Sequence, residues 1–185
     1  FASEALDYVV DEGVQIHGGY GYHQDYAVER AYRDSRINRI WEGTNEINRL
    51  LATGMLLKRA ARGQLPLVAA VEKLQAEILS GPALPSRDRE GAVDEETRLA
   101  ASAKKIALFA MGVAYQRYLT AMEEQQEVLA GLTDLVMQAF ALESAVLRAR
   151  KLLAGGRGAN AADMCAVFAR DSMTQIEGAA RTVLA

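Results

Sequence analysis

The chain has 185 residues and a formal charge of −3, and 50% of its residues are hydrophobic. This length allows one domain of ordinary size, or a small domain joined to part of another. The negative charge argues against nucleic acid as a partner, because phosphate binding depends on a cationic surface. The single cysteine, Cys165, allows no internal disulfide and is typical of a reducing compartment, so we expect a cytoplasmic protein.

Alanine and leucine dominate the composition and only three prolines occur, which favours a helical protein with a hydrophobic core. No apolar run approaches the roughly 18 residues that span a bilayer, so we expect no membrane span. The charged, core-like pattern from Glu95 to Met122 argues against membrane association as well. The sequence starts at Phe1, directly in a helical pattern and without a signal peptide. We therefore expect the chain to be a piece of a longer protein.

Apolar residues at helical spacing predict a first helix over about residues 2–16, ending at the glycine cluster HGGYGY. A second helix is expected over about residues 27–37. A third should begin near Thr44 and end at Gly63. Glu42 therefore falls in a connection between two helices.

A fourth helix is expected after QLPL, and the proline-containing run SGPALPSRDREGAVD, residues 80–94, predicts a linker. Asp94 is expected to cap a long helix that is buried on two sides. One face of this helix has the apolar residues Leu99, Ile106, Phe109 and Val113. The other face has Leu108, Met111, Tyr115 and Leu119.

The apolar pattern from Val128 to Leu153 predicts a further helix that ends at GGRG, and a last helix should begin near Asn160. Asn160 and Asp163 resemble a capping arrangement. The last helix is expected to bury Met164, Phe168, Ile176 and Val183. With no convincing strand or internal repeat, the chain is predicted to be all-α.

Several motifs have an ordinary structural interpretation. GGYG lacks the Lys-Ser/Thr of a phosphate loop, which favours a helix terminator. Arginines recur every third residue from Arg30 to Arg39 among acidic residues, which predicts a solvated or ion-paired face. The two histidines and Cys165 do not have the spacing of a zinc site, so no metal is expected, and Cys165 is expected in the core. The tyrosines near GGYG could surround a flat ligand or form a packed corner.

The run VQIHGGYGYHQDYAVERAYRDSRINRIWEGTNEINR resembles the C-terminal signature of the acyl-CoA dehydrogenases, a family of flavoenzymes. The resemblance covers about residues 1–63, and the pairing of QIHGGYGY with YRDSRI and WEGTNEI is highly specific. It implies an all-α fold in which residues 1–63 are the end of the catalytic helical bundle. Residues 64–94 would be a helix and a linker, and residues 95–185 an additional helical bundle.

The resemblance implies that Glu42 is the catalytic base. In the family this glutamate removes the pro-R α-proton of an acyl-CoA thioester, while the β-hydrogen leaves as hydride to N5 of FAD. The backbone N–H of Glu42 and a flavin ribityl hydroxyl would polarise the thioester carbonyl. An apolar pocket would make the carboxylate a stronger base.

Four neighbours of Glu42 match binding positions of the family. Gly43 would permit close approach of the thioester, and Trp41 stands beside the base in place of the usual tyrosine or phenylalanine. Thr44 and Glu46 match positions that contact the FAD diphosphate and adenosine, although many members have glutamine at the second position.

Gln15, Gly18 and Gly19 match residues that reach the FAD of a neighbouring subunit, which implies a homo-oligomer. Arg33 and Asp34 also belong to the signature and are expected to support the structure. The sequence after residue 63 is similar to the extension of the very-long-chain branch, which packs on the catalytic body.

By this resemblance the parent protein would oxidise long acyl chains in fatty acid β-oxidation and pass electrons to electron-transfer flavoprotein. The isolated chain would be inactive. One alternative is an acyl-CoA oxidase on the same scaffold. Another is a helical module, with a vestigial site, that binds a partner or a membrane.

Overall fold

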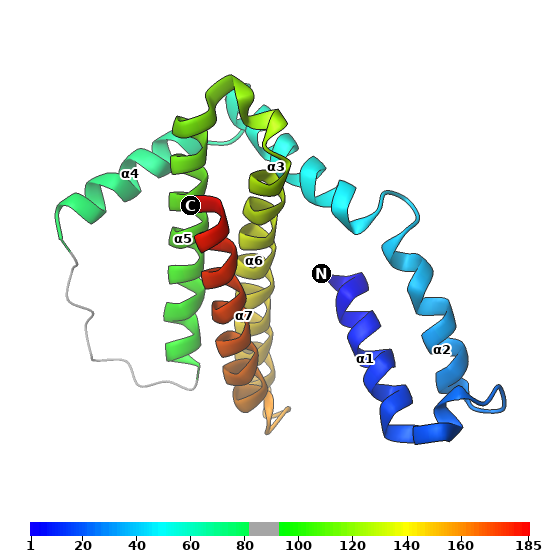
Figure 1. The fold of residues 1–185 in the computed structure, drawn as a ribbon. Coiled ribbons are helices and arrows are strands. Elements are labelled where there is room, and N and C mark those ends of the chain that lie inside the picture. Colours follow the sequence, from blue (N-terminus) through cyan, green and yellow to red (C-terminus); the bar gives the residue numbers. More distant parts are fainter. Residues whose placement is uncertain (82–92) are drawn as a thin grey trace. The chain divides into compact units, whose positions relative to one another are not determined.

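The computed structural model describes residues 1–81 and 93–185, apart from the side chain of Thr120 (Figure 1). Helices and short 3₁₀ turns form the described part, and no strand occurs in it, as predicted. The chain divides into two compact units, Phe1–Asn48 and Arg49–Ala185. Most of the predicted linker at residues 80–94 lies outside the described residues.

The first unit is a helical hairpin. Helix α1, Ala2–His17, leads through the 3₁₀ turn Gly18–Tyr22 into α2, Ala27–Ser35, which packs beside α1 (Figure 1). Helix α2 ends two residues earlier than predicted, and the 3₁₀ turn Arg36–Arg39 follows it.

Two features hold the hairpin together. A Cβ at Gly21 would lie 2.6 Å from the carbonyl oxygen of Val14, so the turn can pass this close to α1 only with glycine. Arg39 Nη1 pairs with Asp7 Oδ2 at 2.5 Å. The arginine series is partly ion-paired, as predicted, because Arg33 also pairs with Glu29.

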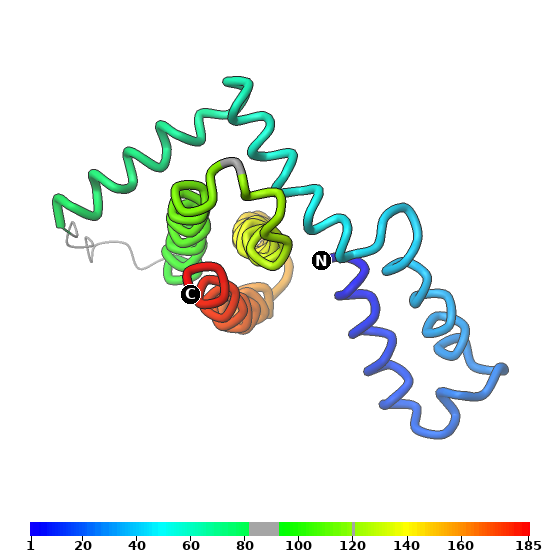
Figure 2. The backbone as a smooth tube through the Cα atoms, turned by 45° about the horizontal axis from the view of Figure 1, so that its top comes forward, coloured from blue at the N-terminus to red at the C-terminus, as the bar shows by residue number. Residues whose placement is uncertain are grey.

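The second unit contains most of α3, Asn45–Ala61, then α4, Leu67–Leu79, α5, Asp94–Tyr118, α6, Gln126–Ala154, and α7, Ala161–Leu184. Helices α5, α6 and α7 surround a common core, and each contacts the other two (Figure 2). The helical pattern of α6 correctly predicted this core, since Leu132, Leu135 and Leu142 are fully buried. Cys165 is buried in it as well, as predicted.

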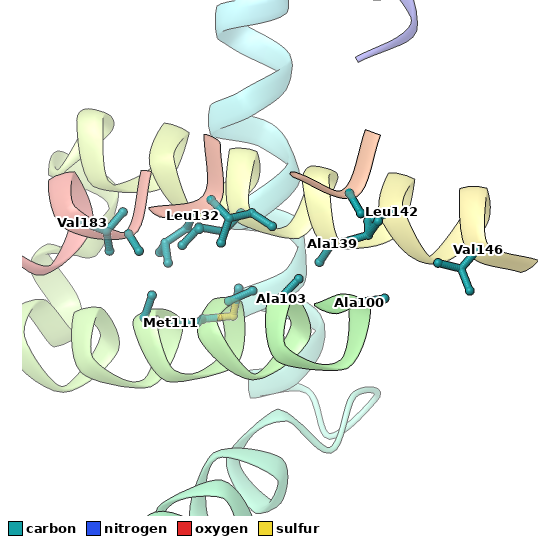
Figure 3. Close-up of a cluster of buried hydrophobic side chains, with 14 of the residues drawn as sticks. Ala100, Ala103, Met111, Leu132, Ala139, Leu142, Val146 and Val183 are labelled. Carbon is teal, nitrogen blue, oxygen red and sulfur yellow. The ribbon is translucent and has the colours of Figure 1, made fainter. Parts of the chain in front are cut away.

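The prediction that α5 buries its large apolar residues is confirmed for Met111, but it was wrong for Phe109, Tyr115 and Leu119, which are exposed. The helix turns its alanines inward, and Ala103 and Ala110 are fully buried while Phe109 is exposed. Figure 3 shows Ala100, Ala103 and Met111 of α5 facing the side chains of α6. Small residues let two helix backbones approach closely, so side-chain volume rather than hydrophobicity alone selects the buried face.

The two predicted helix caps differ from expectation. The cap position of α5 holds Val93 with φ of 71°, so Asp94 is instead the first residue of the helix, where it pairs with Arg150 at 3.6 Å. Asn160 precedes α7 without a side-chain capping bond. Ile176 and Val183 of α7 are buried, as predicted, and Phe168 is partly buried against the core. Met164 is 71% exposed, because its neighbour Cys165 occupies the buried face.

Contrary to the expectation from the sequence, α6 is long and apolar enough to cross a membrane, by length and composition only. The helix packs along α5 and α7, which accounts for its apolar character. Length and composition alone are weak support for a membrane span, because the core helix of a bundle passes the same test.

A polar cluster joins α3 to α6. Thr53 is fully buried, with Oγ1 at 2.7 Å from Thr133 Oγ1 and at 3.0 Å from the carbonyl oxygen of Leu129. Beside it, Arg49 Nε donates to Asp134 Oδ1 at 2.8 Å. Buried hydroxyl groups that find partners favour one register between two helices over its neighbours.

Candidate active site

The loop before α3 has a strained backbone. Glu42 adopts φ of 53° and Gly43 adopts φ of 89°, so two consecutive residues occupy the left-handed region. Glycine tolerates this conformation, whereas it is uncommon for a residue with a side chain. Such strain persists only where the surrounding structure enforces it, and it concentrates at functional sites.

Helix α3 begins immediately after this loop, as predicted. The Thr44 hydroxyl accepts a hydrogen bond from the backbone N–H of Ile47 at 3.3 Å, as an N-cap does. The first turn also connects to α1, because Ser3 Oγ donates to Asn45 Oδ1 at 3.0 Å. The loop is therefore anchored by a capped helix.

The Asn48 side chain holds the loop from the other side. Its Nδ2 donates to the carbonyl oxygen of Gly43 at 2.7 Å. A Cβ at Gly43 would lie 2.8 Å from Asn48 Oδ1, so the carboxamide occupies the space that any other residue would need. Sequence reasoning missed Asn48, although it lies only six residues after Glu42, because nothing in the pattern shows that its side chain turns back.

The Glu42 carboxylate is exposed, and within the described part of the chain it forms no hydrogen bond or ion pair. Trp41 beside it is 57% exposed, so the loop presents an apolar indole next to an uncommitted carboxylate. A general base needs such an available oxygen within reach of the proton that it removes. The apolar pocket expected around the base is not formed by the described residues.

The second predicted set lies at the other end of α1. Gln15, Gly18 and Gly19 are exposed, and no atom lies within 4 Å of a Cβ placed on either glycine, so a ligand can approach this backbone. The Tyr20 and Tyr26 rings lie 5.3 Å apart. Because Tyr20 is exposed, these aromatics form an accessible surface and not a packed corner.

The structure does not bring the two predicted sets together. Ser3 contacts the start of α3, whereas Gln15 lies twelve residues further along α1, which corresponds to roughly 18 Å of helix. Trp41, Glu42, Gly43, Thr44 and Glu46 thus form one cluster, while Gln15, Gly18 and Gly19 form another (Figure 1 shows the two ends of α1). Within one chain, a ligand held by the first cluster would have to be extended to reach the second.

A phosphate-containing cofactor fits these surfaces in part. The Thr44 hydroxyl accepts from Ile47 and still has its own proton to donate, and the space beside Gly18 and Gly19 is open. The Gly18 N–H, however, already donates to the Gln15 carbonyl oxygen. Glu46, in the first turn of α3, disfavours a second negative charge at the same place.

Comparison with known proteins agrees with this geometry. Two family models, both described as the C-terminal domain of acyl-CoA dehydrogenase, match residues 1–57 and residues 102–185. Both matched regions are thus similar to the C-terminal domain of acyl-CoA dehydrogenases. Every residue of both predicted clusters lies within the first match.

Two acyl-CoA dehydrogenases of Bacillus are similar along nearly the whole chain. A probable acyl-CoA dehydrogenase of Bacillus subtilis is 48% identical over 187 residues, which cover 100% of this chain and 31% of the relative. A crystal structure of an acyl-CoA dehydrogenase complexed with FAD from Bacillus anthracis has a TM-score of 0.91 and 43% identity, covering 98% of this chain and 31% of that one. The chain therefore spans about a third of the length of these relatives.

A third relative is similar over a shorter part of the chain. The caffeyl-CoA reductase-Etf complex subunit CarC of Acetobacterium woodii is 49% identical over 59 residues, which cover 32% of this chain and 16% of that protein.

Proposed function

We propose that the chain is the C-terminal part of an FAD-dependent acyl-CoA dehydrogenase, in which Glu42 is the catalytic base. The observation that carries this proposal is the uncommitted Glu42 carboxylate, held in a left-handed conformation directly before α3 and inside the family match. We further propose that the remainder of the protein supplies the apolar walls of the site.

In the proposed reaction the Glu42 carboxylate removes the α-proton of an acyl-CoA thioester, forming an O–H bond as the α C–H bond breaks. The Glu42 backbone N–H donates to the thioester carbonyl and stabilises the negative charge that develops there. FAD, when bound, would accept the β-hydrogen as hydride. Gly43 leaves room for the thioester, and Trp41 borders the acyl chain.

Thr44 and the first turn of α3 would hold the phosphate-containing part of FAD, with the contribution of Glu46 depending on its orientation. Gln15, Gly18 and Gly19 would contact FAD bound in a second subunit. These three residues lie at the end of α1 that is opposite to the one in contact with the start of α3, and this separation supports the assignment. We therefore propose a homo-oligomer.

We propose long acyl chains as substrates, in fatty acid β-oxidation in the cytoplasm, with electron-transfer flavoprotein as the acceptor. The similarity to both Bacillus dehydrogenases through the helical extension supports the assignment to an extended branch. An Etf complex is named for the Acetobacterium relative, which supports the choice of acceptor.

The reverse reaction is a second candidate, because 59 residues of the chain are 49% identical to a subunit of a caffeyl-CoA reductase-Etf complex. In that direction a protonated Glu42 would donate its proton to the α-carbon. The similarity along the whole chain is to proteins named as dehydrogenases, which favours oxidation.

The test uses the full-length protein of which we propose this chain is a part, purified with FAD. Anaerobic bleaching of the flavin is followed with acyl-CoAs of increasing length, for the wild type and Glu42→Gln. We expect Glu42→Gln to keep FAD and to lose bleaching by at least about a hundredfold, since general-base catalysis contributes about 10²–10⁴. Unchanged bleaching would show that another group is the base. Formation of peroxide in air, instead of reduction of electron-transfer flavoprotein, would identify an oxidase.

A further inference from the structure

The Glu42–Gly43 loop is held by one side chain to which the proposed chemistry gives no role. The Asn48 carboxamide donates to the Gly43 carbonyl at 2.7 Å, and its oxygen lies where a Gly43 side chain would be. Asn48 is exposed, so it contributes little to a hydrophobic core. Its contact with the loop is therefore the feature that needs an explanation.

The bond restrains the backbone around the proposed base. Each residue has only two soft backbone dihedrals, so tying the Gly43 carbonyl to α3 removes most of the freedom of the segment between Glu42 and the helix. Asn48 itself is fixed in α3, because its backbone N–H donates to the Thr44 carbonyl at 2.9 Å. Glu42 then retains its left-handed φ of 53°, although its side chain forms no hydrogen bond or ion pair with the described residues.

We propose that Asn48 is a positioning residue for Glu42. This inference rests on the proposed function, since it concerns the same base. Asn48 touches neither the reacting atoms nor the cofactor in this assignment. It acts by holding the Gly43 peptide, and thereby the N–H and carboxylate of Glu42, in the geometry that the proton transfer requires.

A purely structural role for Asn48 predicts a different pattern of variants. Asn48 lies at the end of the first turn of α3, where a negative charge is neutral or favourable. If only helix stability mattered, Asn48→Asp would equal the wild type. If the hydrogen bond matters, Asn48→Asp loses the donor and places a carboxylate oxygen against the Gly43 carbonyl, so it should be at least as impaired as Asn48→Ala.

The test compares Asn48→Asp, Asn48→Ala and Asn48→Gln in the full-length protein with FAD, by anaerobic bleaching with an acyl-CoA that bleaches the wild type. For Asn48→Asp and Asn48→Ala we expect the rate constant at saturating acyl-CoA to fall roughly tenfold, and the half-saturating concentration to change less than about twofold. Asn48→Gln keeps a donor on a longer side chain and should recover part of the rate. FAD content and circular dichroism should stay those of the wild type.

Asn160→Asp is the matched control, because Asn160 precedes α7 without a side-chain capping bond and lies in the other unit. A rate constant for Asn48→Asp within about twofold of the wild type, or an equal fall in Asn160→Asp, would overturn the proposal. If Asn48→Asp fails to retain FAD, the test is the comparison of the bleaching rate constants of Asn48→Gln and Asn48→Ala. Equal rate constants for these two variants would overturn the proposal. Glu42→Gln is measured in the same experiment. Normal bleaching by Glu42→Gln would refute the proposed base. If Glu42→Gln is inactive while the Asn48 variants bleach normally, only the role of Asn48 is refuted.

Discussion

Two glycines within helices of the bundle differ in what a side chain would meet. A Cβ at Gly131 of α6 would lie 2.7 Å from Val183 Cγ2 of α7, and Val183 is buried. At Gly178 of α7 nothing lies within 4 Å. Replacing each glycine by alanine therefore separates helix propensity from packing.

The expected free energies follow from these contacts. Alanine in a helix interior is favoured over glycine by about 1 kcal/mol, and this gain applies to both sites. Overpacking costs about 1–3 kcal/mol and applies only at Gly131, because Val183 would have to move. Gly178→Ala should thus raise the free energy of unfolding by about 1 kcal/mol. Gly131→Ala should leave it unchanged or lower it by up to about 2 kcal/mol.

The assay is urea unfolding of the 185-residue chain, followed by circular dichroism and by fluorescence of Trp41. Circular dichroism reports the helix content of both units, whereas Trp41 fluorescence reports only the unit Phe1–Asn48. A change of the urea midpoint that is seen by circular dichroism but not by fluorescence therefore locates the effect in the bundle. Val183→Ala should remove most of the penalty of Gly131→Ala, because the clashing methyl group is then absent. Equal stabilisation by both glycine replacements would refute close packing of α6 on α7 at this point.

Two further predictions concern buried polar groups. Thr133→Val removes the hydroxyl that pairs with Thr53 at 2.7 Å and should cost about 1–3 kcal/mol in urea unfolding, whereas Thr174→Val, on an exposed surface, should cost less than about 0.5 kcal/mol; equal effects would contradict the role of the hydroxyl pair. Burial, with a smaller effect of Glu96, raises the pKa of the Cys165 thiol. The native state therefore keeps its proton to higher pH, and this contribution to stability is complete below about pH 8.5, the pKa of an unfolded thiol, and is lost as the pH rises through the native pKa. Alkylation at pH 8 should be slow in the native chain and fast in urea, and equal rates would show that Cys165 is accessible.

Local sequence was sufficient to find the proposed base. Glu42, Gly43 and Thr44 are adjacent in the chain, so a motif identifies them together, and the glycine and threonine also predicted the start of α3. The backbone geometry at Glu42 could not be predicted, because glutamate has no preference for the left-handed region. Nor could the contact of Asn48 with Gly43, since it depends on one rotamer in the folded helix.

The order and approximate bounds of the helices were determined by the sequence alone, since apolar spacing and glycine stops are local properties. The choice of buried face was decided by the tertiary structure. In α5 the alanines are buried while Phe109 is exposed, and in α7 Met164 is exposed while Cys165 is buried. A helical pattern shows which residues share a face, but the close approach of neighbouring helices decides which face has the volume that fits.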